Sequence, residues 1–348
     1  MQKQALTIGM PAGSLANASR GGNLIQLLEQ SGFKTSGYDS GGPSKFTTVN
    51  YLYGWDGRPQ EFGSQLSIGE LDVAIAGDDW IKERIIELKL EYNIALSLKR
   101  VLSLNRGGVR IVGIIKNNAF TSIGEFLKDF FSKNTLLTVV SEMPYLALNW
   151  LQEKMKAEGL FDQFSAFSVQ KYKTPAKINT GILVYETWGK TEAKVMNEGA
   201  DIGLEITQSG SAIRNYGLKI IDTVLESETA IYINPSLKKD KEKTELLRIF
   251  LLNLYGSVNA ENKVMIFFNV SNDNTTAIEK YLRDNNLFAS EPTVNRGHDF
   301  TEYSIQVNTA DKNVPLAKIR YDLAMLKAKH IDTIPIDSSI PGIDVINI

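Results

Sequence analysis

The sequence contains no cysteine among its 348 residues. This absence excludes disulfide bonds, thiolate zinc sites and cysteine nucleophiles, and it is compatible with the cytoplasmic location that we expect. Histidine is scarce as well, because only His298 and His330 are present, both in the last fifth of the chain. A metal site or a catalytic triad built on histidine is therefore not expected earlier in the chain, and we expect both histidines to be surface or packing residues.

Long apolar runs and a surplus of one charge are also missing. No segment approaches the roughly 18 consecutive apolar residues of a spanning helix, and no long apolar run follows Lys3, so we expect neither a membrane span nor a signal peptide. The formal net charge is −2, and we interpret the lysine-rich stretch 237–243 as a solvated helix face. Because duplex-binding proteins usually carry a basic surplus, nucleic acid is not an expected partner.

What is present is an alternation of apolar strands with helices. Apolar residues make up 43% of the chain and charged residues 22%, which is typical of a globular protein. The patterns predict strands at 5–10, 71–77, 109–115 and 136–140, and helices around 24–28, after 78, at 123–131 and at 145–155. This alternation favours an α/β fold of open sheets covered by helices, in which ligands bind at the carboxyl ends of the strands.

The last third of the chain has a different order of predicted elements. A helix is expected to begin within the charged stretch 236–245 and to continue to about Tyr255. It is followed by a predicted strand, helix, strand and helix at 263–270, 275–285, 302–307 and 314–327. This order within about 80 residues predicts a separate, small α+β module of the ferredoxin-like kind.

The segment Glu205–Ser211 has the pattern of a loop that holds the phosphate of a ribose phosphate. A predicted strand ends at Glu205, a Ser-Gly-Ser turn follows, and a helix then begins. Small residues let backbone N–H groups and the helix start approach a phosphate, the hydroxyls of Thr207, Ser209 and Ser211 can donate hydrogen bonds, and Glu205 can accept from ribose hydroxyls, directly or through Mg²⁺. The alternative is an ordinary strand-to-helix turn with a serine cap.

Several collinear motifs resemble those of the ATP phosphoribosyltransferase family in its long form. The segment Glu205–Arg214, followed by Gly217-Leu218, resembles the family's phosphate loop. Further similar segments occur in the family's order on both sides: Gly9–Leu15 with Arg20-Gly21, Arg58–Glu61, Asp72–Trp80, Ser141–Pro144, Trp188–Val195 and Ile220–Ser227. The resemblance covers almost the whole chain.

The resemblance implies a fold and a reaction. It implies a two-lobed catalytic part like that of periplasmic binding proteins, with two open sheets, and a C-terminal ferredoxin-like regulatory domain. The expected boundaries are 1–108 with 213–236 for lobe I, 109–212 for lobe II and 237–348 for the regulatory domain. The implied reaction transfers phosphoribosyl from phosphoribosyl pyrophosphate to N1 of ATP with Mg²⁺, as the first step of histidine biosynthesis. Histidine is the implied feedback inhibitor, and a homo-oligomer, a hexamer or a dimer, the implied assembly.

Site residues are carried over from the resemblance by position. Glu205 and Arg58 are the implied catalytic residues, with Glu205 also the implied Mg²⁺ ligand. The residues implied to hold phosphoribosyl pyrophosphate are Glu205, Thr207, Gln208, Ser209, Gly210, Ser211 and Ala212. The residues implied to bind ATP are Gly13, Ser14, Arg20, Arg58, Asp78 and Glu142. Such chemistry depends on positioning and charge stabilisation more than on a covalent nucleophile.

The chain departs from the family pattern at positions that face the substrates. Ala12 stands where the family usually has a lysine, and Glu205 where it usually has an aspartate. Gln208 replaces a carboxylate, Ala212 replaces a threonine, and the basic pair expected after Pro144 is missing. Three hypotheses follow: a working enzyme with variant motifs, a phosphoribosyltransferase for another acceptor, or a diverged paralogue that binds ligand without turnover.

For several of these residues a structural role competes with the functional one. Arg58 is either a ligand contact or a surface arginine in a loop. Asp78 and Asp79 either face the substrate or cap the helix at Trp80. Trp188 and Tyr185 are expected in the core, although an adenine ring could stack on either side chain.

Overall fold

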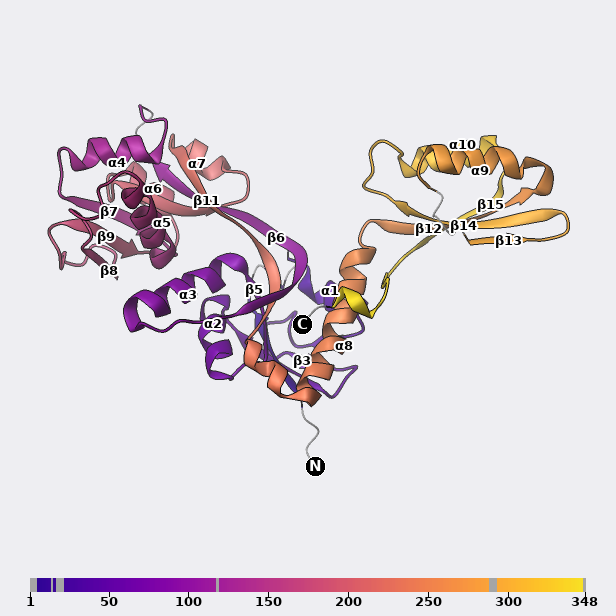
Figure 1. Cartoon of the computed structure of the whole chain (residues 1–348), viewed down its shortest axis with the longest axis horizontal. Coiled ribbons are helices and arrows are strands. Elements are labelled where there is room, and N and C mark those ends of the chain that lie inside the picture. The colour runs from indigo at the N-terminus through magenta and orange to yellow at the C-terminus, as the bar shows by residue number, and fades with distance from the viewer. Residues whose placement is uncertain (1–4, 14, 17–21, 117–118, 288–292, 347–348) are drawn as a thin grey trace. The chain divides into compact units, whose positions relative to one another are not determined.

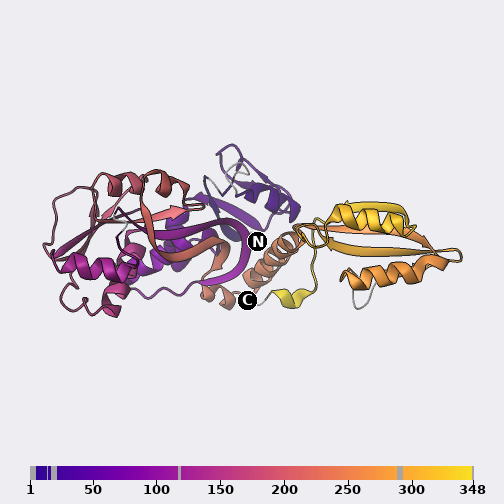
Figure 2. The ribbon, with the colours of Figure 1, turned by 90° about the horizontal axis from the view of Figure 1, so that it is seen from above.

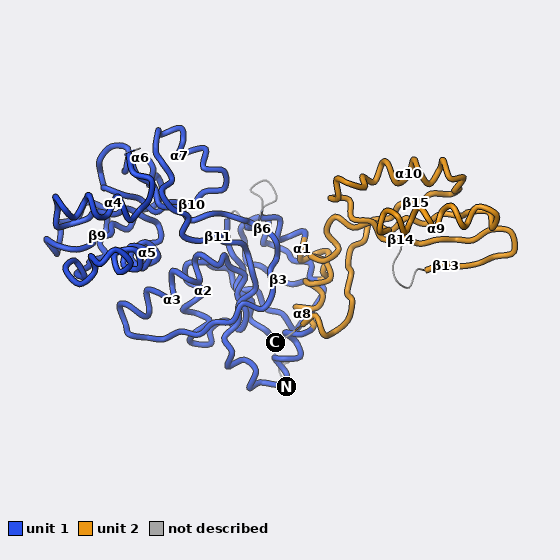
Figure 3. Tube along the Cα trace, turned by 45° about the horizontal axis from the view of Figure 1, so that its top comes forward, with its two compact units in different colours: residues 1–26, 33–248, 348 blue, residues 27–32, 249–347 orange. Residues whose placement is uncertain are grey.

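The computed structural model describes residues 5–13, 15–16, 22–116, 119–287 and 293–346. Contacts between Cα atoms divide the chain into two compact units, one of residues 1–26, 33–248 and 348, and one of residues 27–32 and 249–347 (Figure 3). The division along the chain falls within a single long helix, α8 (Lys241–Ala260). Among the described helices, none has the length and apolar character needed to cross a bilayer.

The first unit is built on one nine-stranded mixed sheet. Its strand order is β4-β1-β5-β11-β6-β10-β7-β9-β8. The strands are β1 (Leu6–Pro11), β4 (Leu52–Gly57), β5 (Val73–Gly77), β6 (Lys99–Ile115), β7 (Leu136–Ser141), β8 (Phe167–Lys171), β9 (Gly181–Glu186), β10 (Ile202–Thr207) and β11 (Lys219–Ile233). A short hairpin of β2 (Thr35–Ser36) and β3 (Lys45–Phe46) forms its own small sheet.

Two lobes share this sheet, because β6 and β11 are long enough to run through both. The two strands pair antiparallel from Lys99 to Ile115, with β5 beside β11 in lobe I and β10 beside β6 in lobe II. Figures 1 and 2 show them as long curved strands that join the two halves. The expectation of an α/β two-lobed part is met, but the two expected sheets are joined into one by these strands.

Helices pack against both halves of the sheet. They are α2 (Pro59–Ile68), α3 (Asp78–Tyr92), α4 (Ile123–Phe131), α5 (Pro144–Ala157), α6 (Thr191–Met196) and α7 (Ser211–Asn215), while α1 (Leu24–Gln30) precedes them in the sequence. Helix α4 shows how the local sequence alone can specify where a helix begins and which of its faces is buried. Ser122 accepts the Glu125 N–H at 3.2 Å as an N-cap, and Phe126 and Leu127 turn into the core of lobe II.

The charged stretch before α8 differs from the predicted solvated helix face. A 3₁₀ turn, Pro235–Lys239, precedes the helix, which begins only at Lys241. Lys243 is not a solvated residue, because its Nζ atom lies 2.7 Å from Oδ1 of the buried Asp72 side chain. This ion pair fastens the start of α8 to the beginning of β5.

The second unit has the ferredoxin-like order of elements. These are β12 (Lys263–Ser271), a 3₁₀ turn (Asn272–Asn274), α9 (Thr275–Asp284), β13 (Thr293–Arg296), β14 (Phe300–Asn308), α10 (Leu316–Met325), β15 (Lys329–Pro335) and a 3₁₀ turn (Ile343–Val345). The antiparallel sheet has the order β13-β14-β12-β15, and both helices cover one face of it (Figure 1). The prediction of a separate ferredoxin-like module is confirmed. His298 and His330 are exposed, as expected.

Candidate active site

The carboxyl ends of strands from both lobes meet at the cleft of the first unit. A cavity of about 870 Å³ opens there, and we call it the Trp188 cavity. Arg58 follows β4 of lobe I, while Glu142 follows β7 and Thr187 and Trp188 follow β9 of lobe II, and all four line this cavity. The cleft is the position in which an open α/β sheet places its ligands, and the cavity has the size of a small-molecule site.

Arg58 projects from the start of α2 into this cavity. It occupies the N-cap position of α2 in an extended conformation, with Pro59 as the first helical residue. Within the described part of the chain its guanidinium group has no ion pair. The Ala12 N–H donates to Gly57 O at 3.0 Å, so the loop after β1 begins beside Arg58. Gly13 follows with a φ of +93°, a backbone conformation that favours glycine. Predicted contacts at Ser14 and Arg20 lie outside the described residues.

Glu142 is half-buried on the opposite wall of the Trp188 cavity. Burial raises the pKa of its carboxyl group, while Lys194 nearby lowers it. The Gly189 N–H donates to this carboxylate. Glu142 is thus connected to the turn that contains Trp188, whose side chain is 82% exposed and stands on the cavity wall.

Two aromatic residues near this turn differ from each other in burial. The prediction that Trp188 is a core residue is wrong, since β9 ends at Glu186 and leaves the indole beyond the sheet. Tyr185 is 7% exposed and lies in the core, as expected.

The predicted phosphate loop joins β10 to α7. Gly210 has a φ of +71°, which a side chain would strain, and it precedes the first helical residue, Ser211. The Thr207 hydroxyl accepts the Gly210 N–H at 2.9 Å, and the Ser209 hydroxyl accepts the Ser211 N–H at 3.3 Å. A phosphate oxygen that entered this loop would replace these two hydroxyl acceptors. Helix α7 has only five residues, so backbone N–H groups and hydroxyls, rather than a helix dipole, are the donors here.

At the other end of the loop, Glu205 forms a carboxyl pair with Glu192. Glu192 is 8% exposed and comes from the first turn of α6. Burial is the larger cause, and the neighbouring Glu192 the second, of a rise in the pKa of Glu205 to about 7. Oε2 of Glu205 and the hydroxyl of Thr187 are buried and lack hydrogen-bond partners among the described residues. Hydroxyl donors from a ligand would satisfy these oxygens.

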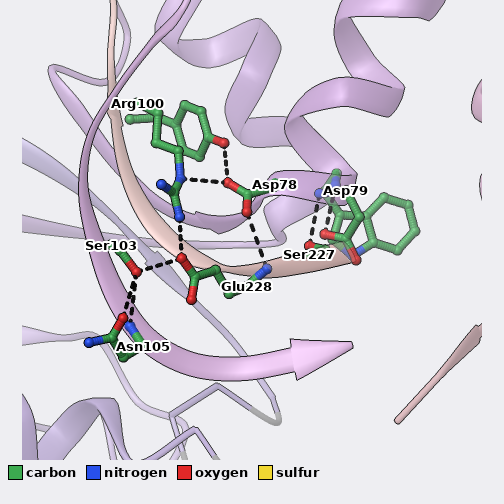
Figure 4. Close-up of polar contacts among 9 residues, drawn as sticks. Asp78, Asp79, Arg100, Ser103, Asn105, Ser227 and Glu228 are labelled. Atoms are coloured by element: carbon green, nitrogen blue, oxygen red, sulfur yellow. Dashed lines mark hydrogen bonds and ion pairs between the residues drawn. The ribbon is translucent and has the colours of Figure 1, made fainter. Parts of the chain in front are cut away.

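Asp78 belongs to a network that joins the start of α3 to β6 and β11 (Figure 4). Its Oδ1 atom lies 2.9 Å from Nε of Arg100 and also accepts the Tyr232 hydroxyl. Its Oδ2 atom accepts the Glu228 N–H at 3.2 Å, and Arg100 pairs in turn with the Glu228 carboxylate. Most of the acceptor capacity of Asp78 is therefore used internally, and its contact with ATP stays a prediction.

Asp79 makes the other contact at this helix start. Its main-chain N–H donates to the Ser227 hydroxyl at 3.1 Å, while its carboxylate accepts the N–H of Trp80 at 2.8 Å. The carboxylate therefore satisfies a donor of the first turn of α3, which agrees with the capping alternative for this residue.

A second cavity, of about 760 Å³, is lined by Asp78 and by Gln208 of the phosphate loop, and we call it the Arg110 cavity. Arg110 and Gln208 line it together with Lys82 and Glu226. Of the predicted residues, Arg58 and Glu142 thus share one cavity, and Asp78 and Gln208 share the other. Sequence reasoning missed Glu192, Arg110 and Glu83, which are brought to the cleft only by strand pairing and by packing between the lobes.

Comparisons with known proteins relate this chain to one family. Residues 58–254 match the family model of ATP phosphoribosyltransferase. A relative from Solibacter usitatus, an ATP phosphoribosyltransferase, is 28% identical over 78% of this chain and 80% of its own length. ATP phosphoribosyltransferase 1 from Geobacter sulfurreducens is 25% identical over 96% of this chain and 99% of its own length. Among solved structures, the ATP phosphoribosyl transferase (HisG:HisZ) complex from Thermotoga maritima contains a similar chain, with 14% identity, a TM-score of 0.48, and coverage of 72% of this chain and 98% of that chain.

The family match together with the fold describes a two-lobed phosphoribosyltransferase with an added ferredoxin-like unit. Because the family model matches more than half of its residues, this chain belongs to the ATP phosphoribosyltransferase family. The family and the transferase class predicted from the sequence are therefore confirmed.

Proposed function

We propose that the protein transfers the phosphoribosyl group of phosphoribosyl pyrophosphate to N1 of ATP, the first step of histidine biosynthesis. N1 of the adenine forms a bond to C1 of the ribose, and the bond from C1 to the pyrophosphate oxygen breaks. The observation that carries this proposal is the position of Glu205, the first residue of the loop, beside the Trp188 cavity: Leu204 of β10 pairs with Ser141 of β7, and the next residue on β7's side is Glu142, which lines that cavity. A ribose phosphate and a nucleotide could thus meet between the lobes.

The carboxyl pair of Glu192 and Glu205 fits the ribose hydroxyls. The Glu192 side chain is buried and that of Glu205 is half-buried. Oε1 of Glu205 accepts the Ile206 N–H at 2.9 Å, while Oε2 has no partner among the described residues, and a vicinal diol supplies two hydroxyl donors. The Thr187 hydroxyl, which is buried and has no partner among the residues that the structure describes, is available for a further contact. With the phosphate in the loop, these contacts would fix the ribose at both ends, so that C1 is oriented for attack.

The walls of the Trp188 cavity fit a nucleotide. The exposed indole of Trp188 offers a face for an adenine ring, with Lys171 Nζ 5.8 Å from its centroid. Arg58, Lys171 and Lys177 line the cavity and supply positive charge for phosphates. In this arrangement Arg58 would stabilise the negative charge that develops on the departing pyrophosphate.

Magnesium fits this donor set as a partner of the substrate. Within the described ranges, no group of three or more His, Cys, Asp or Glu side chains is placed to hold a metal ion. Mg²⁺ is commonly bound through one or two carboxylates together with substrate phosphates and water. Glu205 and Glu192 would be those carboxylates, and the ion would neutralise charge on the pyrophosphate.

The finer properties implied by the family are part of the same proposal. We expect the ferredoxin-like unit to regulate the enzyme by binding histidine, and the chain to assemble as a homo-oligomer, a hexamer or a dimer, in the cytoplasm. The net charge of −2 and the absence of a basic surplus agree with small-molecule substrates rather than nucleic acid.

The test is a turnover assay with phosphoribosyl pyrophosphate, ATP and Mg²⁺, following pyrophosphate release and the absorbance of the adduct. We expect turnover by the native chain, and a loss of about 100-fold or more in the Arg58→Ala variant, because charge stabilisation in a closed site contributes several kcal/mol. Absence of turnover, with phosphoribosyl pyrophosphate still bound in calorimetry, would instead support another acceptor or a regulatory paralogue.

A further inference from the structure

Arg110 lies beside the predicted phosphate loop, although it comes from a different strand. It is on β6, where it pairs in register with Thr207 of β10 on one side and with Glu226 of β11 on the other. Its Nη2 atom lies 3.9 Å from the position that a Cβ atom on Gly210 would take. The guanidinium group is therefore on the side of Gly210 that a side chain would occupy, and Arg110 and Gln208 line the same cavity.

The other arginines around this loop already have partners. Arg100 pairs with Asp78 and Glu228, and Arg214 donates from Nη1 to Ser209 O at 2.9 Å. The side chain of Arg110, which is half-buried, makes no hydrogen bond or ion pair within the part of the chain that the structure describes. Glu226, the acidic residue opposite it in the sheet, forms no ion pair with it there.

A guanidinium group with free donors is suited to a phosphate. Its planar fork offers two parallel N–H groups to two oxygens, and such charge-assisted bonds are stronger than bonds between neutral groups. In the Arg110 cavity, Lys82 is the other cation without a partner among the described residues, but it lies on α3 rather than on a strand beside the loop. Lys82 therefore provides a matched control for charge alone.

We propose that Arg110 binds the 5-phosphate of the phosphoribosyl substrate from the β6 side of the loop. This inference rests on the proposed function and deepens it. The loop N–H groups contact the phosphate from one side, and the Arg110 fork adds a positive charge from the adjacent strand β6. Arg110 then selects a phosphorylated ribose over a free ribose. We expect this contact to be equally strong in the ground state and in the transition state, so that it contributes to substrate binding and not to the chemical step.

The experiment compares the native chain with Arg110→Gln, Arg110→Lys and Lys82→Gln. Calorimetry with ribose 5-phosphate measures binding directly, and the turnover assay gives KM for phosphoribosyl pyrophosphate and kcat. We expect Arg110→Gln to weaken the binding of ribose 5-phosphate and to raise KM for phosphoribosyl pyrophosphate by about 10- to 100-fold, since a hydrogen bond to a charged group is worth roughly 1.5–3 kcal/mol. The kcat value should stay within about threefold of the native value. Arg110→Lys, which keeps the charge and loses the fork, should be intermediate, and Lys82→Gln should bind like the native chain.

The outcomes separate this inference from the proposed function. Turnover by the native chain, with KM and ribose 5-phosphate affinity unchanged in Arg110→Gln, would overturn the role of Arg110 and leave the function intact. Equal losses in Arg110→Gln and Lys82→Gln would also overturn it, because they would reflect the charge of the cavity in general. If the native chain has no turnover, the proposed function fails, and the calorimetric comparison still decides the role of Arg110. A native chain that does not bind ribose 5-phosphate overturns the inference as well.

Discussion

The Glu83 carboxylate accepts the main-chain N–H of Leu146 at 2.6 Å and so joins α3 of lobe I to α5 of lobe II. It also accepts the Tyr145 N–H at 3.0 Å. These are N–H groups of the first turn of α5, which have no acceptor within the helix, and a carboxylate is a favourable partner for them. Glu83 is 6% exposed, so one buried side chain from the first lobe caps a helix of the second. We infer that this contact holds the two lobes together.

This position changes the acidity of Glu83. Burial raises its pKa to about 8, although the two N–H donors from α5 and, to a smaller extent, Arg84 lower it, while Glu87 raises it further. A carboxyl group in an unfolded chain has a pKa of about 4.3. The folded state therefore binds the proton more tightly, and the stability that protonated Glu83 contributes is present at low pH and is lost as the pH rises towards about 8.

The first prediction concerns Glu83→Gln, which is neutral at every pH. We expect the difference in melting temperature, native chain minus variant, to decrease as the pH rises from 5 to 9. Differential scanning calorimetry measures both temperatures. Glu70→Gln, a change at an exposed glutamate, serves as the control and should give a difference that is independent of pH. A difference for Glu83→Gln that is constant over this range would contradict the assigned acidity.

The second prediction tests whether the Glu83 contact with α5 holds the lobes together. Because the chain has no cysteine, spin labels can be attached only where cysteines are introduced, for example in Ile68→Cys on α2 and Met196→Cys on α6, both exposed. We expect Glu83→Ala to lengthen and broaden the distance distribution between the labels, measured by pulsed electron paramagnetic resonance. An unchanged distribution would show that other contacts hold the lobes.

The third prediction follows from the carboxyl pair. With its pKa at about 7, Glu205 carries a proton in a large fraction of the molecules below neutral pH, and only the ionised form accepts from both ribose hydroxyls. We expect kcat/KM for phosphoribosyl pyrophosphate to rise with pH through about 7. Glu192→Gln removes the neighbouring carboxyl group, so it should move this limb of the profile to lower pH, and Glu205→Gln should abolish the limb. A profile that is identical in all three proteins would exclude the pair from ribose binding.

The fourth prediction concerns Trp188, whose exposed ring stands on the wall of the cavity. Stacking of a base on an aromatic ring is worth about 1–3 kcal/mol, so Trp188→Ala should weaken ATP binding by roughly 5- to 150-fold. Trp188→Phe should retain most of the affinity. Calorimetric titration with ATP checks this, and the melting temperature should hardly change because the ring is outside the core. Equal ATP affinity in the native chain and Trp188→Ala would show that the base binds elsewhere.

Local patterns explain which parts of the fold could be predicted. Helix α4 was predicted with its observed bounds, Ile123–Phe131, because its serine cap and its apolar face are both local signals. Strand β6 was predicted only from Val109, whereas it begins at Lys99. The missing part has only three apolar residues, Val101, Leu102 and Leu104, among charged and small ones, and it is a strand because β11 pairs with it along its length. Pairing between distant segments of this kind leaves little trace in a local window.

The same distinction applies to the site. The loop around Gly210 was recognised from the sequence because a turn with positive φ has local requirements. Glu192 and Arg110 reach the loop from α6 and from β6, so their roles depend on packing and register and not on neighbours in the sequence. The role of Glu83 depends also on how the two lobes pack together, because its hydrogen-bond partners belong to the other lobe.

The last prediction concerns Ala12, at the end of β1, where a cation is expected in the family and none is present here. The Ala12 N–H donates to Gly57 O, and Arg58 follows directly, so a side chain at position 12 would lie beside the guanidinium group that lines the Trp188 cavity. Ala12 is exposed, so a longer side chain can be accommodated without repacking. We expect Ala12→Lys to add a second positive charge against the substrate phosphates and to raise kcat/KM by about 10-fold or more, which corresponds to roughly 1.4 kcal/mol.

Ala12→Gln, of similar length without the charge, is the matched control and should stay within about twofold of the native rate. If both variants change the rate equally, the length of the side chain matters rather than its charge. If neither does, the chain has reached its native rate by a contact other than the missing lysine.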